Sequence, residues 1–215
     1  MLRLRLLLPF AALAMMLSYA APAAAQTIID EWQNVKPPPA PELTAVTVDP
    51  QTTALLMVDF LNKNCAPNPR CVATLPKVQK LLAAARTKGL TVIYSNYPGG
   101  GDVVPEVARK DTEPLVTGIL EKFVLTNKDG SQDTGLDKML KDKGIKTVIV
   151  LGNAANGAVL YTATAAFFHG YQTIVPVDGV SAKSPYIEQE VVYNFVSAPV
   201  MGGKVTLTSI DMIKF

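Results

Sequence analysis

Three places in the sequence carry residue types that can do chemistry. Asp59 follows the apolar run 54–58, Lys122 stands between Glu and Phe, and the turn 152–157 reads Gly-Asn-Ala-Ala-Asn-Gly before a helical stretch that opens at Ala158. An aspartate beside a lysine in a partly dry cleft can hold or deliver a proton. A helix N-terminus offers backbone N–H groups to a carboxylate or a developing oxyanion. The same pattern is also compatible with a structural ion pair and an ordinary glycine-rich turn.

The apolar spacing of the chain predicts the elements that position these residues. Continuous apolar runs followed by helical spacing, with short connections, favour an α/β fold: doubly wound, with a mostly parallel sheet and helices on both faces. In such sheets ligands bind beyond the carboxyl ends of the strands, where Asp59 and the turn 152–157 fall. Lys122 is expected in a strand or strand edge at 120–125. The other predicted strands are 54–58, 91–94, 147–151, 173–177 and 205–207, and the predicted helices are 75–85, 136–140, 158–168 and 187–195.

The first 25 residues have the pattern of a secretory signal peptide. Two arginines precede the apolar run 6–17, and three alanines, 23–25, precede Gln26. An uncleaved membrane anchor is the alternative, but Pro9 and the small-residue cleavage site favour a signal that is removed. We therefore expect a periplasmic or secreted protein that is not attached to the membrane.

The rest of the chain has a balanced charge and the composition of a globular domain. The segment 1–25 holds two of the 20 basic residues and none of the 18 acidic ones, so the remainder has no net formal charge. A nucleic-acid partner then has no electrostatic support, and a small-molecule substrate or ligand is expected. The run Lys-Pro-Pro-Pro-Ala-Pro predicts an extended proline-rich arm at 26–49, ahead of one domain at 50–215.

The two cysteines predict a disulfide rather than a metal or redox site. Cys65 and Cys71 lie six positions apart in a segment rich in Asn and Pro, and an oxidising compartment favours their pairing. A free, reactive Cys65 is the minor alternative. His169 is the only histidine and stands at the end of a predicted helix, which favours a surface role. We predict no metal site and no cofactor.

Four stretches of the sequence resemble the isochorismatase-like hydrolase superfamily, in order and at suitable spacing from about Thr53 to Thr208. The resemblance implies a doubly wound α/β fold, an acid/base aspartate at Asp59 and a catalytic lysine at Lys122. Many members are cysteine hydrolases. The stretches are Ala54-Leu-Leu-Met-Val-Asp59-Phe, Glu121-Lys122, Thr134-Gly-Leu136 with Gly144-Ile145, and Gly152 through Val159-Leu-Tyr-Thr162-Ala163 to Gly170-Tyr171.

The chain departs from the superfamily pattern at the nucleophile. Ala158 stands where the resemblance implies a cysteine, and a methyl group cannot attack a carbonyl. Leu61 replaces the usual glutamine two residues after the aspartate, and the sequence 95–98 lacks the histidines of metal-binding nicotinamidases. Isochorismatases proper also lack the cysteine and hydrolyse a vinyl ether through the aspartate, which makes them the nearest precedent.

Two functions follow from the resemblance and its departures. The first is a hydrolase that uses Asp59 and Lys122 as acid, base and charge stabiliser, and the second is a lapsed enzyme that keeps a binding pocket. The resemblance further implies oxygen-binding N–H groups at Ala155 and Ala158 and a cis peptide bond at Ala154–Ala155. Association with further copies of the chain is compatible with it. The residues expected to contact substrate are Tyr97, Ala154, Ala155 and Asn156.

Overall fold

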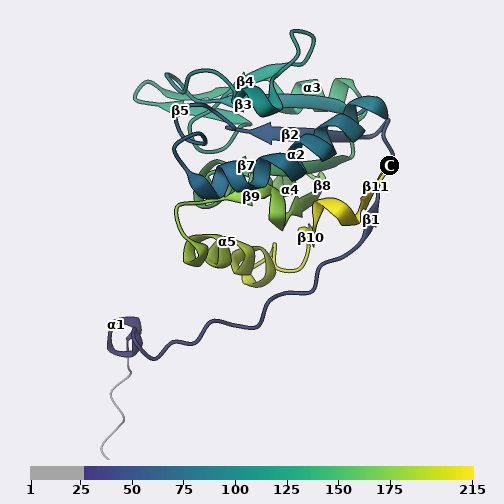
Figure 1. Ribbon diagram of the computed structural model, residues 1–215. Coiled ribbons are helices and arrows are strands. Elements are labelled where there is room, and N and C mark those ends of the chain that lie inside the picture. Colours follow the sequence, from purple (N-terminus) through teal and green to yellow (C-terminus); the bar gives the residue numbers. More distant parts are fainter. Residues whose placement is uncertain (1–26) are drawn as a thin grey trace, which may run out of the picture. The chain divides into compact units, whose positions relative to one another are not determined.

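The strands of the large sheet lie side by side and run parallel (Figure 1). The computed structural model describes residues 27–215, so the predicted signal peptide and Gln26 lie outside the described residues. The strand order is β10-β8-β7-β2-β3-β4, and β9 pairs with the end of β7. The sheet strands are β2 Thr53–Val58, β3 Thr91–Asn96, β4 Leu115–Thr117, β7 Thr147–Asn153, β8 Gln172–Pro176, β9 Val180–Ser181 and β10 Thr206–Thr208.

The helices connect these strands and cover the sheet. Every residue of β2 and of β7 is buried, as expected for central strands between two helical layers. Parallel crossovers are right-handed, so α2, between β2 and β3, and α4, between β7 and β8, cover opposite faces. The mostly parallel α/β fold that the sequence predicts is confirmed. The helices are α2 Pro69–Thr87, α3 Leu136–Asp142, α4 Leu160–Phe168 and α5 Pro185–Ser197, with short 3₁₀ segments at Pro105–Val107, Val177–Gly179 and Ile210–Met212.

The strand order reverses between β2 and β7. From β2 the chain adds β3 and β4 on one side, and from β7 it adds β8 and β10 on the other. Val58 pairs with Gly152, so Asp59 and Asn153 leave neighbouring strands at the same edge. This edge is the topological switch point, where open parallel sheets bind their ligands.

Several segments differ from the sequence expectations. Helix α2 begins at Pro69 rather than near Leu75, because Asn68 caps it and Pro69 fits its first turn. The predicted strand 120–125 is wrong at Lys122, since the chain bends through 119–123, and only 124–125 fall within β5.

The remaining elements are short. β5 Val124–Asn127 and β6 Gly130–Asp133 form an antiparallel hairpin. β1 Val46–Thr47, within the predicted proline-rich arm, pairs in parallel with β11 Ile213–Lys214 near the C-terminus. Residues 27–38 form a unit of their own with the one-turn helix α1 Ile28–Glu31.

None of the helices in residues 27–215 is long and apolar enough to cross a membrane.

Candidate active site

Asp59 ends β2 in a conformation that turns the chain out of the sheet. Its φ is +50°, in the left-handed region, which aspartate tolerates better than most residues. The Ser95 hydroxyl, near the end of β3, donates to Asp59 Oδ1 at 2.7 Å, and the Asp59 N–H donates to Ser95 Oγ at 3.3 Å. Asp59 is only 2% exposed. The neighbouring strand therefore fixes both the backbone and the carboxylate of Asp59.

Lys122 reaches Asp59 from the bend after β4. Its Nζ lies 2.8 Å from Asp59 Oδ2 and also donates to the carbonyls of Gly118 at 2.5 Å and Asn96 at 3.3 Å. An ammonium has three N–H donors, and these acceptors use all three. The Lys122 side chain is 1% exposed. Gly118 permits the tight bend here, because a Cβ at this position would lie 2.4 Å from the Glu121 carbonyl oxygen.

Burial dominates the electrostatics of this pair. Loss of solvation raises the pKa of Asp59, although the charge and hydrogen bond of Lys122 and the Ser95 hydroxyl act in the opposite direction. Loss of solvation also lowers the pKa of Lys122, against the effect of Asp59. Both shifts reduce the preference for the ionised form. The pair is therefore better suited to transfer a proton than an exposed ion pair is.

The turn after β7 lies beside this pair at the switch point. Gly152 has φ +151°, and a Cβ there would lie 1.9 Å from the Val58 carbonyl oxygen, so only glycine permits this strand contact. The Asn153–Ala154 peptide bond is cis. The expected cis bond at Ala154–Ala155 is therefore wrong by one residue, because β7 continues through Asn153 before the turn starts.

A single π-helical turn, η2 Ala155–Val159, follows and leads into α4. The N–H groups of Gly157 and Val159 both donate to the Ala154 carbonyl, at 3.0 and 3.3 Å. Ala155 and Ala158 are buried in this turn, whereas Asn156 is exposed. The helix predicted from Ala158 thus starts two residues later, after the π turn.

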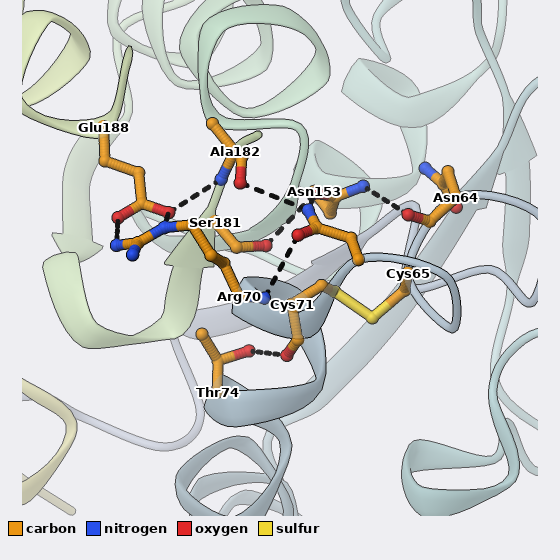
Figure 2. Close-up of a disulfide and its surroundings, with 10 residues drawn as sticks. Asn64, Cys65, Arg70, Cys71, Thr74, Asn153, Ser181, Ala182 and Glu188 are labelled. Carbon is orange, nitrogen blue, oxygen red and sulfur yellow. Dashed lines mark hydrogen bonds and ion pairs between the residues drawn. A yellow bond between two sulfur atoms is a disulfide. The ribbon is translucent and has the colours of Figure 1, made fainter. Parts of the chain in front are cut away.

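The predicted disulfide between Cys65 and Cys71 is present. Both cysteines are fully buried. Figure 2 shows Asn153 between Ser181, from the strand paired with β7, and Asn64, which lies beside the disulfide. The Ser181 hydroxyl donates to Asn153 Oδ1 at 3.1 Å, and Asn153 Nδ2 donates to the Asn64 carbonyl at 3.5 Å. The loop that follows Asp59 therefore contacts the residue that precedes the turn.

One small cavity reaches the ion pair, and a larger one shares only Asn96 with the surroundings of the pair. A cavity of about 10 Å³ is lined by Ser95, Lys122 and Thr162 together with apolar side chains. A larger one, of about 310 Å³, is lined in part by Asn96, Asp102 and Arg109. The Asn96 carbonyl that accepts from Lys122 links this larger cavity to the ion pair. Its volume is typical of a small-molecule site.

The structure brings Asp59 and Lys122 together and places the turn 154–158 at the same edge of the sheet. Tyr97 lies half-buried in the loop after β3, where its carbonyl accepts from the Gly100 N–H at 2.8 Å. Sequence reasoning missed Ser95 as the partner of Asp59. The position of Ser95 near the end of the next strand could have indicated this contact, because that strand ends at the same edge of the sheet as Asp59.

No metal-binding cluster is visible in the described part of the chain: no three His, Cys, Asp or Glu side chains gather there as ligands. His169 instead stacks on Phe123, with ring centroids 4.5 Å apart, and its Nδ1 lies 3.3 Å from Asp137 Oδ1. This cluster belongs to the packing of α3 and α4.

Comparison with known families shows where this chain belongs. The model of the isochorismatase domain matches residues 53–208. The chain belongs to the isochorismatase family. The matched range covers the switch point, the bend with Lys122 and the turn 152–157, so each of these features lies inside the family domain.

Individual proteins of known name are also similar to this chain. Streptothricin hydrolase of Streptomyces noursei is 30% identical over 132 residues, or 58% of this chain and 48% of that protein. This chain therefore spans about half the length of that relative. Maleamate amidohydrolase of Pseudomonas putida is 30% identical over 146 residues, which cover 57% of this chain and 68% of that protein.

A solved structure shows the shared fold. The cysteine hydrolase of Pseudomonas syringae pv. phaseolicola superposes with a TM-score of 0.66 and 19% identity, covering 80% of this chain and 95% of that one.

Proposed function

We propose that this chain hydrolyses a small molecule through Asp59 and Lys122 without a covalent nucleophile. The observation that carries the proposal is the buried pair, with Asp59 Oδ2 2.8 Å from Lys122 Nζ. The raised pKa of Asp59 and the lowered pKa of Lys122, both caused by burial, suit groups that change protonation during a reaction. The names of two relatives, a hydrolase and an amidohydrolase, support hydrolysis.

Asp59 retains the capacity to act on water or substrate. Each carboxylate oxygen accepts one of the hydrogen bonds from Ser95 and Lys122, which leaves a further lone pair on each oxygen. For an amide, Asp59 takes a proton from water as the hydroxyl attacks the carbonyl carbon, and returns it to the leaving nitrogen. For a vinyl ether, protonated Asp59 gives its proton to the alkene carbon, and water then adds to the cationic carbon and returns a proton to Asp59. The resulting hemiketal breaks its bond to the ether oxygen, which takes the hydroxyl proton and leaves as the alcohol, so that a carbonyl remains. Lys122 stabilises Asp59 at each stage in which the carboxyl is ionised.

We propose that the turn completes the site and that substrate enters from the larger cavity, whose wall includes Asn96, an acceptor of Lys122. The N–H groups of Ala155 and Ala158 bind the oxygen on which negative charge develops, and Ala154, Asn156 and Tyr97 flank the substrate. The cavity of about 310 Å³, with the polar side chains of Asp102 and Arg109 on its wall, supports a small polar substrate.

Substitution of Asp59 tests this function. The purified protein is incubated with a panel of small carboxamides and vinyl ethers, with Asp59→Asn and Asp211→Asn assayed in parallel. Asp211 makes the matched control because it pairs with Lys80 on the surface. We expect Asp59→Asn to lower turnover by about 10²–10⁴-fold, the usual contribution of a general acid or base, and Asp211→Asn to leave it unchanged. Retained turnover in a folded Asp59→Asn variant contradicts the mechanism.

A lapsed enzyme that binds a small molecule is the second candidate. Two observations favour it: the side chain at Ala158 is a methyl group, and the Asp59–Lys122 pair is almost inaccessible to solvent. This candidate predicts saturable binding without turnover by the wild type. Gain of amidase activity in Ala158→Cys would support it, and Asp59-dependent turnover by the wild type would exclude it.

We also propose that the protein is exported after removal of residues 1–25. The buried Cys65–Cys71 disulfide supports this, because such bonds persist mainly in oxidising compartments. N-terminal sequencing of the protein from the producing cells should then begin at Gln26. A chain that begins at Met1 and remains in the cytosol would contradict export.

A further inference from the structure

We propose that the disulfide-closed loop 65–71 positions the turn 154–159, and that Asn68 is the positioning residue through which it acts. The loop starts six residues after Asp59 and ends in the first turn of α2. It therefore connects the end of β2 to the start of α2 at the edge of the sheet where the proposed site lies.

The side chain of Asn68 joins three elements. Its Oδ1 accepts from the Arg70 N–H at 3.1 Å and so caps α2. Its Nδ2 donates to Asn153 Oδ1 at 3.3 Å and to the Ala182 carbonyl at 3.2 Å. All of its hydrogen-bonding atoms are thus engaged, two of these bonds being directed away from its own helix.

Asn153 connects the hydrogen bonds of Asn68 to the turn. It is 4% exposed and directly precedes Ala154, whose carbonyl accepts from the N–H groups of Gly157 and Val159. Its Oδ1 accepts from both Asn68 and Ser181, and its Nδ2 donates to the Asn64 carbonyl. Asn68 of the loop and Asn64, which directly precedes it, therefore both hold Asn153, and Figure 2 shows the Asn64 contact beside the disulfide.

The disulfide is better explained by this local role than by anchoring α2. The helix buries six of its own residues in the core, and Arg70 and Lys77 pair with Glu188 and Asp178. A disulfide that closes so short a loop also removes less chain entropy than one that closes a long loop. What the bond restricts is the loop itself, and with it Asn64 and Asn68.

Two variants separate the positioning role from helix capping. Asn68→Ser keeps an oxygen that caps α2 well, but it removes the Nδ2 donor to Asn153 and Ala182. Cys65→Ser/Cys71→Ser opens the loop and keeps Asn68. Thr74→Ala is the matched control, because it removes a 2.8 Å hydrogen bond to the Cys71 carbonyl and has no contact with Asn153.

Amide hydrogen exchange of the full chain, read residue by residue by NMR, tests the proposal. We expect exchange at Gly157 and Val159 to rise about tenfold in Asn68→Ser and at least as much in the double serine variant, with β2 amides unchanged. Thr74→Ala should match the wild type. Unchanged exchange at Gly157 and Val159, or an equal rise throughout the chain, would overturn the proposal. If the double variant does not fold, Asn68→Ser decides alone, since it keeps the disulfide.

A kinetic readout rests on the proposed function, whereas the exchange experiment does not. Where a substrate is turned over, Asn68→Ser should lower kcat with little change in KM, because the turn would bind the oxygen that gains charge in the transition state. A role limited to overall stability would leave kcat per folded molecule unchanged and would contradict this prediction. If the protein proves not to be a hydrolase, the hydrogen-exchange experiment still tests the positioning role of Asn68.

Discussion

Two ion pairs in this protein have nearly the same N···O distance, but the pKa values of their lysines shift in opposite directions. Lys122 lies 2.8 Å from Asp59 at the sheet edge, and Lys77 lies 2.7 Å from Asp178 on the surface of α2. The lysine side chains are 1% and 50% exposed. The hydrogen bond to Asp178 raises the pKa of Lys77, whereas burial lowers the pKa of Lys122 despite Asp59.

The difference shows that the environment, rather than the distance, decides what an ion pair can do. At the surface, water solvates both charges and the pair remains ionised. At the sheet edge both charged forms lose solvation, so the neutral forms become more accessible. This supports a structural role for the pair on α2 and a proton-transfer role for Asp59 and Lys122.

Removing one member of the buried pair should have the largest effect on stability. Lys122→Met leaves the Asp59 carboxyl buried without its cation, and we expect the free energy of unfolding to fall by about 3–5 kcal/mol. Asp59→Asn/Lys122→Met should recover most of this loss, because no unpaired charge remains. Urea unfolding at neutral pH measures both variants. A double variant as unstable as Lys122→Met would contradict the desolvation argument.

The equivalent change in the surface pair should have the smallest effect. Lys77→Met removes the partner of Asp178, but water can solvate the carboxylate that is left. We expect its urea midpoint to differ little from that of the wild type. The difference should become smaller still at high salt, because salt screens exposed charges. A loss as large as that of Lys122→Met would remove the distinction between the two environments.

The sequence predicted the parts of the fold that depend on continuous apolar runs. The runs at 54–58 and 147–151 became the two central strands because strands buried on both faces need apolar residues throughout. β4, with three residues, and the polar strand β6 have no such signal and were missed, whereas the predicted strand 120–125 covers only the first two residues of β5. The C-terminal pairing of β1 with β11 joins segments from opposite ends of the chain, which local patterns do not reveal.

The candidate site was only partly accessible to sequence reasoning. Asp59 stood out because it ends an apolar run, and Lys122 was a candidate partner for it to which the family resemblance then assigned a catalytic role. The hydrogen bond from Ser95 joins residues 36 positions apart, and the contacts of Asn68 with Asn153 join residues 85 apart. Such partners are brought together by strand order, which the sequence specifies only through the complete fold.

The most direct test of the central claim is the pKa of Asp59, measured by ¹³C NMR titration of its carboxyl carbon. Because burial raises this pKa in the folded state, Asp59 should titrate above its ordinary value of about 3.8, and ionisation should cost stability as the pH rises through that range. In Lys122→Met the pKa should rise further, since the ammonium that opposes the shift is gone. A wild-type pKa at or below 3.8, as in an ordinary salt bridge, would contradict the account.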